Sequence, residues 1–243
     1  CIRDSALTLN GLGVTELADR YLKRAEEIGA NEPAVLKCKA LILLNRGNFP
    51  EAAQISRDAL AAGLDDRWGS DQVFLRIARD AALDAGQVDD SLGLYRERAP
   101  KIFEEVPEVD LSTIQYAVDV VPLLRFAGDD EAAERIIAAT LDAYERQNPG
   151  RIRGYDLSIV DIEALALAGE KELALARLTE AVDNGWRLNW EYFVLGRNLA
   201  SLRDEPEYAA AVARLETQSA EQGARWMASP HLGEFDLRDR PLK

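Results

Sequence analysis

An internal repeat with an offset of 34 residues is the feature of this sequence that most restricts its fold. Residues 6–13 (ALTLNGLG) align with residues 40–47 (ALILLNRG), and the same offset joins Ala18 to Ala52. Periods of this length are typical of helical-hairpin repeats, which bury their apolar faces only by stacking on neighbouring units. The offset therefore predicts a stack of helix pairs.

Each unit is expected to contain two helices joined by a glycine turn. In the second unit this turn is residues 47–50 (GNFP). Glycine tolerates the left-handed conformation at a helix end, and proline suits the first turn of the next helix. Ala52 and Ala59 are seven residues apart, so they share a face of that next helix. Small side chains there let a neighbouring helix approach closely.

Three further glycine turns extend the pattern, at Gly86, Gly128 and Gly169. They follow Gly47 at intervals of 39, 42 and 41 residues, so helices or connections are expected to lengthen in the later units. The third unit is the least regular, because Arg79 stands where a small residue is expected. Pro122 lies inside the first helix of the fourth unit, where it predicts a kink or a restart.

The first two units resemble the tetratricopeptide repeat family, whose period is also 34. The family's small residue in the first helix is matched by Ala6 and Ala40. Its second-helix alanines are matched by four residues: Ala18, Ala25, Ala52 and Ala59. Aliphatic residues replace the family's usual tryptophan and tyrosine. The resemblance covers residues 1–183 and implies an all-α fold, a right-handed α-solenoid (a TPR-like superhelix) of about five helical hairpins.

A different segment follows the repeats. Residues 199–208 (LASLRDEPEY) suggest a helix with Asp204 as its N-cap, Pro206 in its first turn and Glu207 in a capping box. A Gly-Trp pair followed by such a run looks like the terminal segment of bacterial tetratricopeptide modules. The last repeat of a solenoid needs a cover. We expect four aromatic side chains to form this cover by packing beneath a C-terminal capping helix: Trp186, Trp190, Tyr192 and Phe193. Their alternative role is a binding platform.

This pattern divides the chain into a repeat domain, residues 1–228, and an extended tail, residues 229–243. Residues 148–151 (NPGR) are the strongest internal break, between units four and five. The chain begins at Cys1. That start fits a fragment of a longer cytoplasmic protein, which we favour, or a periplasmic lipoprotein if Cys1 is a processed lipobox cysteine.

Composition narrows the classes of function. The chain has 29 Lys+Arg against 43 Asp+Glu, a net charge of −14, which argues against direct nucleic-acid binding. No apolar stretch approaches the roughly 20 residues of a membrane span. Two cysteines and one histidine, His231, cannot supply a zinc cluster, and Cys38 is expected to pack as a small hydrophobe. We expect no cofactor, no metal site and no catalysis.

Paired acids follow two of the turn glycines, at residues 89–90 and 129–130. Carboxylate pairs can serve acid–base or metal chemistry, but acids at helix starts also cap N-termini and complement the helix dipole. We favour capping. An enzyme would need convergent carboxylates in a deep pocket, for which Asp80, Asp84 and Asp119 are the candidates.

The concave groove of the solenoid remains as the candidate site. Its lining mixes apolar residues with both charges, which suits a helix or an extended peptide. The lysine/arginine/asparagine clamp that some family members use for a peptide carboxylate is not expected, because leucines stand where an amide is needed. Projection of the repeat assigns ten residues to the groove: Arg3, Leu7, Lys37, Leu41, Asn45, Arg76, Asp80, Asp84, Asp119 and Arg125.

The sequence thus predicts a non-catalytic protein-interaction module, a scaffold or adaptor that binds a protein or peptide partner in its groove. The resemblance implies that it belongs to a larger bacterial regulatory or signalling protein. Self-association is the alternative function, giving a homodimer through the fourth unit or the aromatic cap. Alternatively, the groove binds no partner and is an ordinary solvent-exposed surface.

Overall fold

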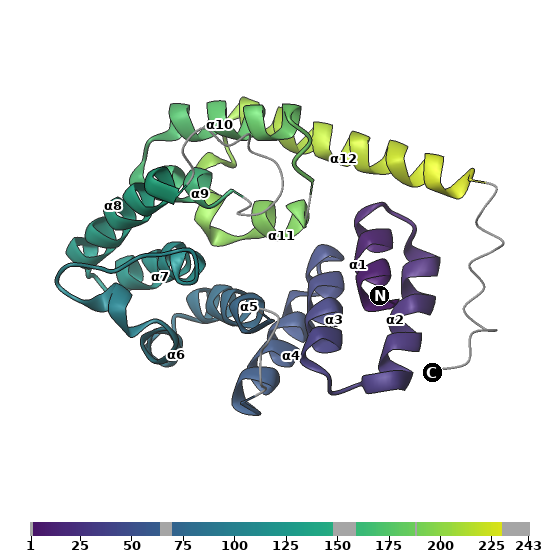
Figure 1. Cartoon of the computed structure of the whole chain (residues 1–243), viewed down its shortest axis with the longest axis horizontal. Coiled ribbons are helices and arrows are strands. Elements are labelled where there is room, and N and C mark those ends of the chain that lie inside the picture. The colour runs from purple at the N-terminus through teal and green to yellow at the C-terminus, as the bar shows by residue number, and fades with distance from the viewer. Residues whose placement is uncertain (1, 64–69, 148–158, 188, 230–243) are drawn as a thin grey trace.

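The computed structural model describes residues 2–63, 70–147, 159–187 and 189–229. Every regular element in these residues is a helix, so the expected all-α class is confirmed. Figure 1 shows the helices following one another along a curved path. The expected break at residues 148–151, Cys1, and residues 230–243 of the tail, which include His231, lie outside the described residues.

Ten helices form five consecutive pairs, and the two helices of each pair pack against each other. Their bounds are α1 (Ile2–Gly11) and α2 (Thr15–Gly29), α3 (Pro33–Asn45) and α4 (Phe49–Ala61), α5 (Ser70–Ala85) and α6 (Asp89–Arg98), α7 (Ile114–Phe126) and α8 (Asp130–Gln147), α9 (Val160–Ala168) and α10 (Lys171–Asp183). A short 3-10 helix, η1 (Pro100–Phe103), follows α6. The architecture is therefore repeat-like.

The glycine turns predicted between paired helices are confirmed. At Gly169 the backbone has φ 82°, a left-handed conformation that side chains disfavour. The amide of Gly169 donates to Ala166 O, and that of Glu170 to Leu165 O, which closes the end of α9. The turn glycines of the four earlier pairs also have positive φ.

Two predicted N-caps are wrong. Glu205, not Asp204, is the N-cap of the last helix, because the residue before Pro206 is held in an extended conformation. At α6 the N-cap is the buried Val88, so Asp89 already lies in the first turn and can act only through the helix dipole. Asp129 does cap α8: its Oδ1 accepts the Ala132 amide at 3.1 Å.

Pro122 lies inside α7, which continues through it, so the expected restart is not seen. Proline in a helix interior costs about 3 kcal/mol. The apolar residues around Pro122 are buried on several sides of α7, including Val118, Val121 and Leu124. Their burial keeps the helix intact.

The C-terminal segment returns across the inner side of the curve. It contains α11 (Trp190–Leu195), the 3-10 helix η2 (Arg197–Leu202) and α12 (Pro206–Met227). In Figure 1, α11 lies within the curve and α12 runs along its edge towards α1. Helix α11 contacts α3, and η2 contacts α7 and α9. The inner side of the curve is therefore occupied by the chain's own C-terminal segment.

Aromatic side chains hold this segment in the largest apolar cluster of the described residues. Trp186, Trp190, Tyr192 and Phe193 are all buried there. Cys38 is also buried, 3% exposed, and its thiol donates to Arg3 O at 3.1 Å. None of the helices in the described part of the chain is long and apolar enough to span a membrane.

Candidate functional site

The first helices of three successive pairs each direct a charged side chain to one buried position. These helices are α5 with Arg76 and Arg79, α7 with Asp119, and α9 with Glu163. All four side chains are at most 1% exposed. Together with Asn198 of η2 they form what we call the inner polar cluster.

Two guanidinium groups and two carboxylates pair within this cluster. Arg76 Nε donates to Asp119 Oδ1 at 2.8 Å, and its Nη2 donates to Glu163 Oε2 at 3.0 Å. Arg79 Nη1 donates to the main-chain oxygen of Asp119 at 2.8 Å, while its Nε donates to Asp80 Oδ1 at 2.8 Å. Each buried charge thus has an opposite charge beside it, which burial requires.

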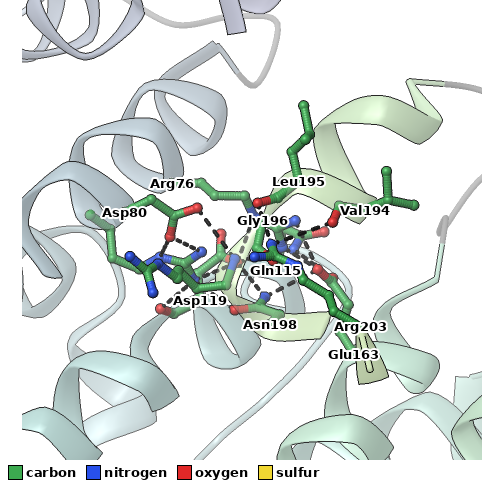
Figure 2. Close-up of polar contacts among 12 residues, drawn as sticks. Arg76, Asp80, Gln115, Asp119, Glu163, Val194, Leu195, Gly196, Asn198 and Arg203 are labelled. Atoms are coloured by element: carbon green, nitrogen blue, oxygen red, sulfur yellow. Dashed lines mark hydrogen bonds and ion pairs between the residues drawn. The ribbon is translucent and has the colours of Figure 1, made fainter. Parts of the chain in front are cut away.

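The amide of Asn198 joins the three helices through both of its polar atoms (Figure 2). Its Nδ2 donates to Asp119 Oδ1 and to Glu163 Oε1, each at 3.1 Å. Its Oδ1 accepts from Arg79 Nη1 at 2.8 Å. The segment that crosses the inner side of the curve is therefore attached by hydrogen bonds to charged groups as well as by apolar contacts.

The electrostatics of the cluster follow from burial and pairing. Burial raises the pKa of Glu163, and the nearby Arg76 only partly opposes this. Burial alone would lower the pKa of Arg76, but Asp119 and Glu163 hold it well above its usual value. Arg76 therefore keeps its charge, and Glu163 is the group of this pair that is easier to protonate than usual.

Aromatic rings and main-chain carbonyls complete the attachment of α11. The guanidinium of Arg76 lies 4.9 Å from the Tyr192 ring centroid, a cation–π contact. Arg203 Nη2 donates to the carbonyl oxygens of Leu195 and Gly196 at 2.6 and 2.9 Å. These bonds satisfy carbonyls at the end of α11, which has no further turn to pair them.

A cavity of about 670 Å³ lies beside the cluster, between α3, α4, α5 and the α11–η2 segment. Its apolar lining includes the buried Leu44, Ile77 and Tyr192. Phe49 and Leu195 also line it and are 51% and 39% exposed. Its charged lining comprises Arg57, Arg76, Asp80, Asp84, Arg197 and Arg203.

The structure corrects the expectation that ten residues line one open groove. Arg76 and Asp119 are buried in the inner polar cluster, and Leu41 is buried in the apolar core. Asp80 and Asp84 line the cavity with Arg76. The reason is the α11–η2 segment, which covers the inner face that the repeat projection left open.

The other five predicted groove residues do not join this region. Arg125 forms an ion pair within the α7–α8 hairpin. Arg3, Leu7, Lys37 and Asn45 lie on α1 and α3. All five are half-buried, and none lines the cavity.

The carboxylates considered for catalysis are all engaged in ion pairs. Asp119 accepts from Arg76, Asp80 pairs with Arg79, and Asp84 pairs with Arg197. Each thus has an arginine beside it, and Arg79 contacts both Asp80 and Asp119. Over the ranges that the structure describes, no three His, Cys, Asp or Glu side chains are grouped as metal ligands would be.

Sequence reasoning missed Glu163 and Asn198, and it treated Arg79 as a defect. Two of these carried a signal. Arg79 replaces a small residue of the repeat, and Glu163 lies in a helix, VDIEALALA, whose only other polar residue is Asp161. A charge in such a position has to be paired inside the fold. Asn198 carried no signal, because its partners are distant in sequence.

Comparison of the chain with protein-family models, with curated proteins and with solved structures gave no match. The fold and the site therefore define only a broad class of protein. It is an all-helical, repeat-like architecture whose inner face holds a buried ionic cluster and an adjoining cavity.

Proposed function

We propose that this chain is a tetratricopeptide-like solenoid, a right-handed stack of five helical hairpins with a C-terminal cap, that acts as a non-catalytic protein-interaction module. The 34-residue offset supports the first part, together with five helix pairs whose turns all contain a left-handed glycine. Solenoids of this kind present their inner first-helix residues to partners. The proposed module would serve as an adaptor within a larger bacterial regulatory or signalling protein.

One observation carries the location of the binding site. The α11–η2 segment already covers the inner face at α7 and α9, whereas the cavity beside α3, α4 and α5 is open. Its volume of about 670 Å³ is that of a ligand pocket, and it exposes two large apolar side chains, Phe49 and Leu195. Exposed apolar side chains at a concave site are typical of binding surfaces.

The proposal assigns no catalytic role to the cavity. Asp80 and Asp84, the carboxylates in its lining, are each paired with an arginine. A general base needs a free carboxylate within reach of its proton. The inner polar cluster has a structural role in this proposal, because Asn198 fills its centre.

The test compares three forms of the protein by the partners that each captures from a lysate of the cells in which the protein naturally occurs. The double variant Phe49→Ser/Leu195→Ser alters the cavity, and Ile28→Ser/Leu173→Ser is its matched control at exposed apolar sites outside the cavity. We expect native protein and control to retain the same partners and the cavity variant to lose them.

Equal capture by all three forms, or no capture by the native protein, would contradict the proposal. Light scattering of the same samples tests the alternative of self-association. A dimer that is lost only in the cavity variant would assign the cavity to a second copy of the chain instead of a different partner.

A further inference from the structure

We propose that the cavity binds an acidic peptide segment that also carries a large apolar side chain. This inference rests on the proposed function and specifies its partner. Carboxylates of the peptide would pair with Arg57 and Arg203, and its apolar side chain would lie between Phe49 and Leu195.

The charge of the cavity is the first argument. The whole chain has 43 acidic against 29 basic residues, yet the cavity lining has the opposite balance. Four arginines line it, against two aspartates, Asp80 and Asp84. A locally cationic site on an acidic protein attracts an anionic partner and repels a cationic one.

Ion pairing within the protein then shows which arginines are available. Asp84 neutralises Arg197, and Asp119 and Glu163 neutralise Arg76. The remaining two are Arg57 and Arg203.

Neither Arg57 nor Arg203 has a carboxylate partner among the described residues. Arg57 Nη2 donates to the neutral Gln54 side chain at 2.8 Å, and Arg203 donates from Nη2 to main-chain oxygens. Both residues are exposed. Glu205 lies two residues after Arg203, but its carboxylate is paired with Lys171 at 2.8 Å instead. A guanidinium group with free N–H donors matches a carboxylate in charge and geometry.

The apolar part of the cavity gives the second half of the specificity. Small residues, Ala53 and Ala81, line it between the larger apolar groups and leave its volume open. Phe49 and Leu195 expose apolar surface that a partner's side chain could bury, which is the main source of affinity at such sites. Charge would therefore select the partner, and apolar burial would hold it.

The experiment uses the full chain and three short synthetic peptides of about nine residues, acetylated and amidated so that only side chains carry charge. The first has glutamates flanking one phenylalanine and one leucine in a glycine–serine background. The second and third replace the glutamates by glutamine or by lysine. Fluorescence anisotropy measures each affinity at low salt.

We expect the glutamate peptide to bind about tenfold more tightly than the glutamine peptide, and this difference to shrink in about 1 M salt. Arg57→Gln should remove most of the difference while leaving the glutamine peptide unchanged. Arg20→Gln, at an exposed arginine of α2 outside the cavity, is the matched control and should have no effect. Arg203 is not substituted, since it also closes the end of α11.

A further variant, Ala81→Phe, fills the cavity without changing its charge and should weaken both peptides. Equal binding of the glutamate and glutamine peptides, or tighter binding of the lysine peptide, overturns the acidic preference. If the peptides bind without an acidic preference and Ala81→Phe abolishes their binding, the cavity is still a binding site and the proposed function stands. Failure of all three peptides to bind overturns the inference, while partner loss in the Phe49/Leu195 double variant tests the proposed function separately.

Discussion

At the scale of single residues, Asn198 shows how one amide can fix the course of a chain segment. Its partners Arg79, Asp119 and Glu163 lie on three different helices, and the bond to Arg79 spans 119 residues of sequence. All of these groups are buried, so they rely on partners inside the fold for their hydrogen bonds. The contribution of Asn198 to stability therefore comes mainly from the hydrogen bonds that these buried charged groups would lose without it.

Asn198→Ala should lower the free energy of unfolding by about 3 kcal/mol, because it removes one hydrogen bond from each of three buried charged groups, Arg79, Asp119 and Glu163. Urea unfolding measures this loss. Asn184→Ala, at an exposed helix end, is the control and should change stability by less than about 0.5 kcal/mol. Equal, small effects of both substitutions would show that the inner polar cluster does not depend on Asn198.

Glu163→Gln should change how stability depends on pH. Burial raises the pKa of Glu163 above its ordinary 4.5, so the folded protein holds this proton more tightly than the unfolded chain does. The stability that this proton contributes is complete below about pH 4.5 and is lost as the pH rises through the raised pKa. The free energy of unfolding of the native protein should therefore fall over this window relative to that of the variant.

Urea unfolding of both proteins from about pH 4 to about pH 8 checks this prediction. The other carboxylates contribute nearly equally to the free energy of unfolding of both proteins, so their contributions cancel in the difference. A difference that is constant with pH, or that moves in favour of the native protein as pH rises, would contradict it.

At the scale of elements, the position of α12 depends on a missing side chain. Gly223 lies in its interior, and an added Cβ there would overlap the carbonyl oxygen of Leu12 in the α1–α2 turn. Trp226, one turn further, packs against the apolar cluster of α1 and α2. The end of α12 therefore contacts the first helix pair directly, and a glycine makes that approach feasible.

Alanine substitutions at two helical glycines should have opposite effects. Gly93 of α6 has open space at the position of a Cβ, so Gly93→Ala should stabilise the protein by about 0.5–1 kcal/mol through helix propensity. Gly223→Ala gains the same propensity but displaces α12 from Leu12, for a net loss of about 1–3 kcal/mol. Thermal unfolding of both variants measures this, and stabilisation by both would refute the close contact.

At the scale of the whole molecule, the helix pairs are connected by more than contacts between neighbours. In a simple repeat protein each unit interacts only with the next, and unfolding can proceed unit by unit. Here the inner polar cluster links α5, α7, α9 and η2 at once. By contrast, α1 and α2 belong to a small separate apolar cluster, completed by part of α3 and by Trp226 of α12.

We therefore expect α5, α7, α9 and η2 to open together in native-state hydrogen exchange, with α1 and α2 opening at lower free energy. Asn198→Ala should reduce amide protection in α5 and α9 as well as in η2, and leave α2 unchanged. Mass spectrometry of exchanged peptides can resolve these helices. Loss of protection confined to η2 would indicate independent units.

The sequence alone determined the local features of this protein. The helix pairs and their glycine turns follow from apolar periodicity and turn chemistry, both of which act over a few residues. The burial of Cys38 and of the aromatic residues around Trp186 was also predictable, because large apolar side chains are buried wherever the chain provides a core.

Only the tertiary structure decided what occupies the inner face. The repeat projection left Arg76 and Asp119 on an open groove, whereas the α11–η2 segment covers them and leaves the cavity as the accessible part. The physical reason is distance along the chain. A contact such as that between Arg79 and Asn198 depends on the summed curvature of all the intervening helices, and no local pattern of residues encodes that sum.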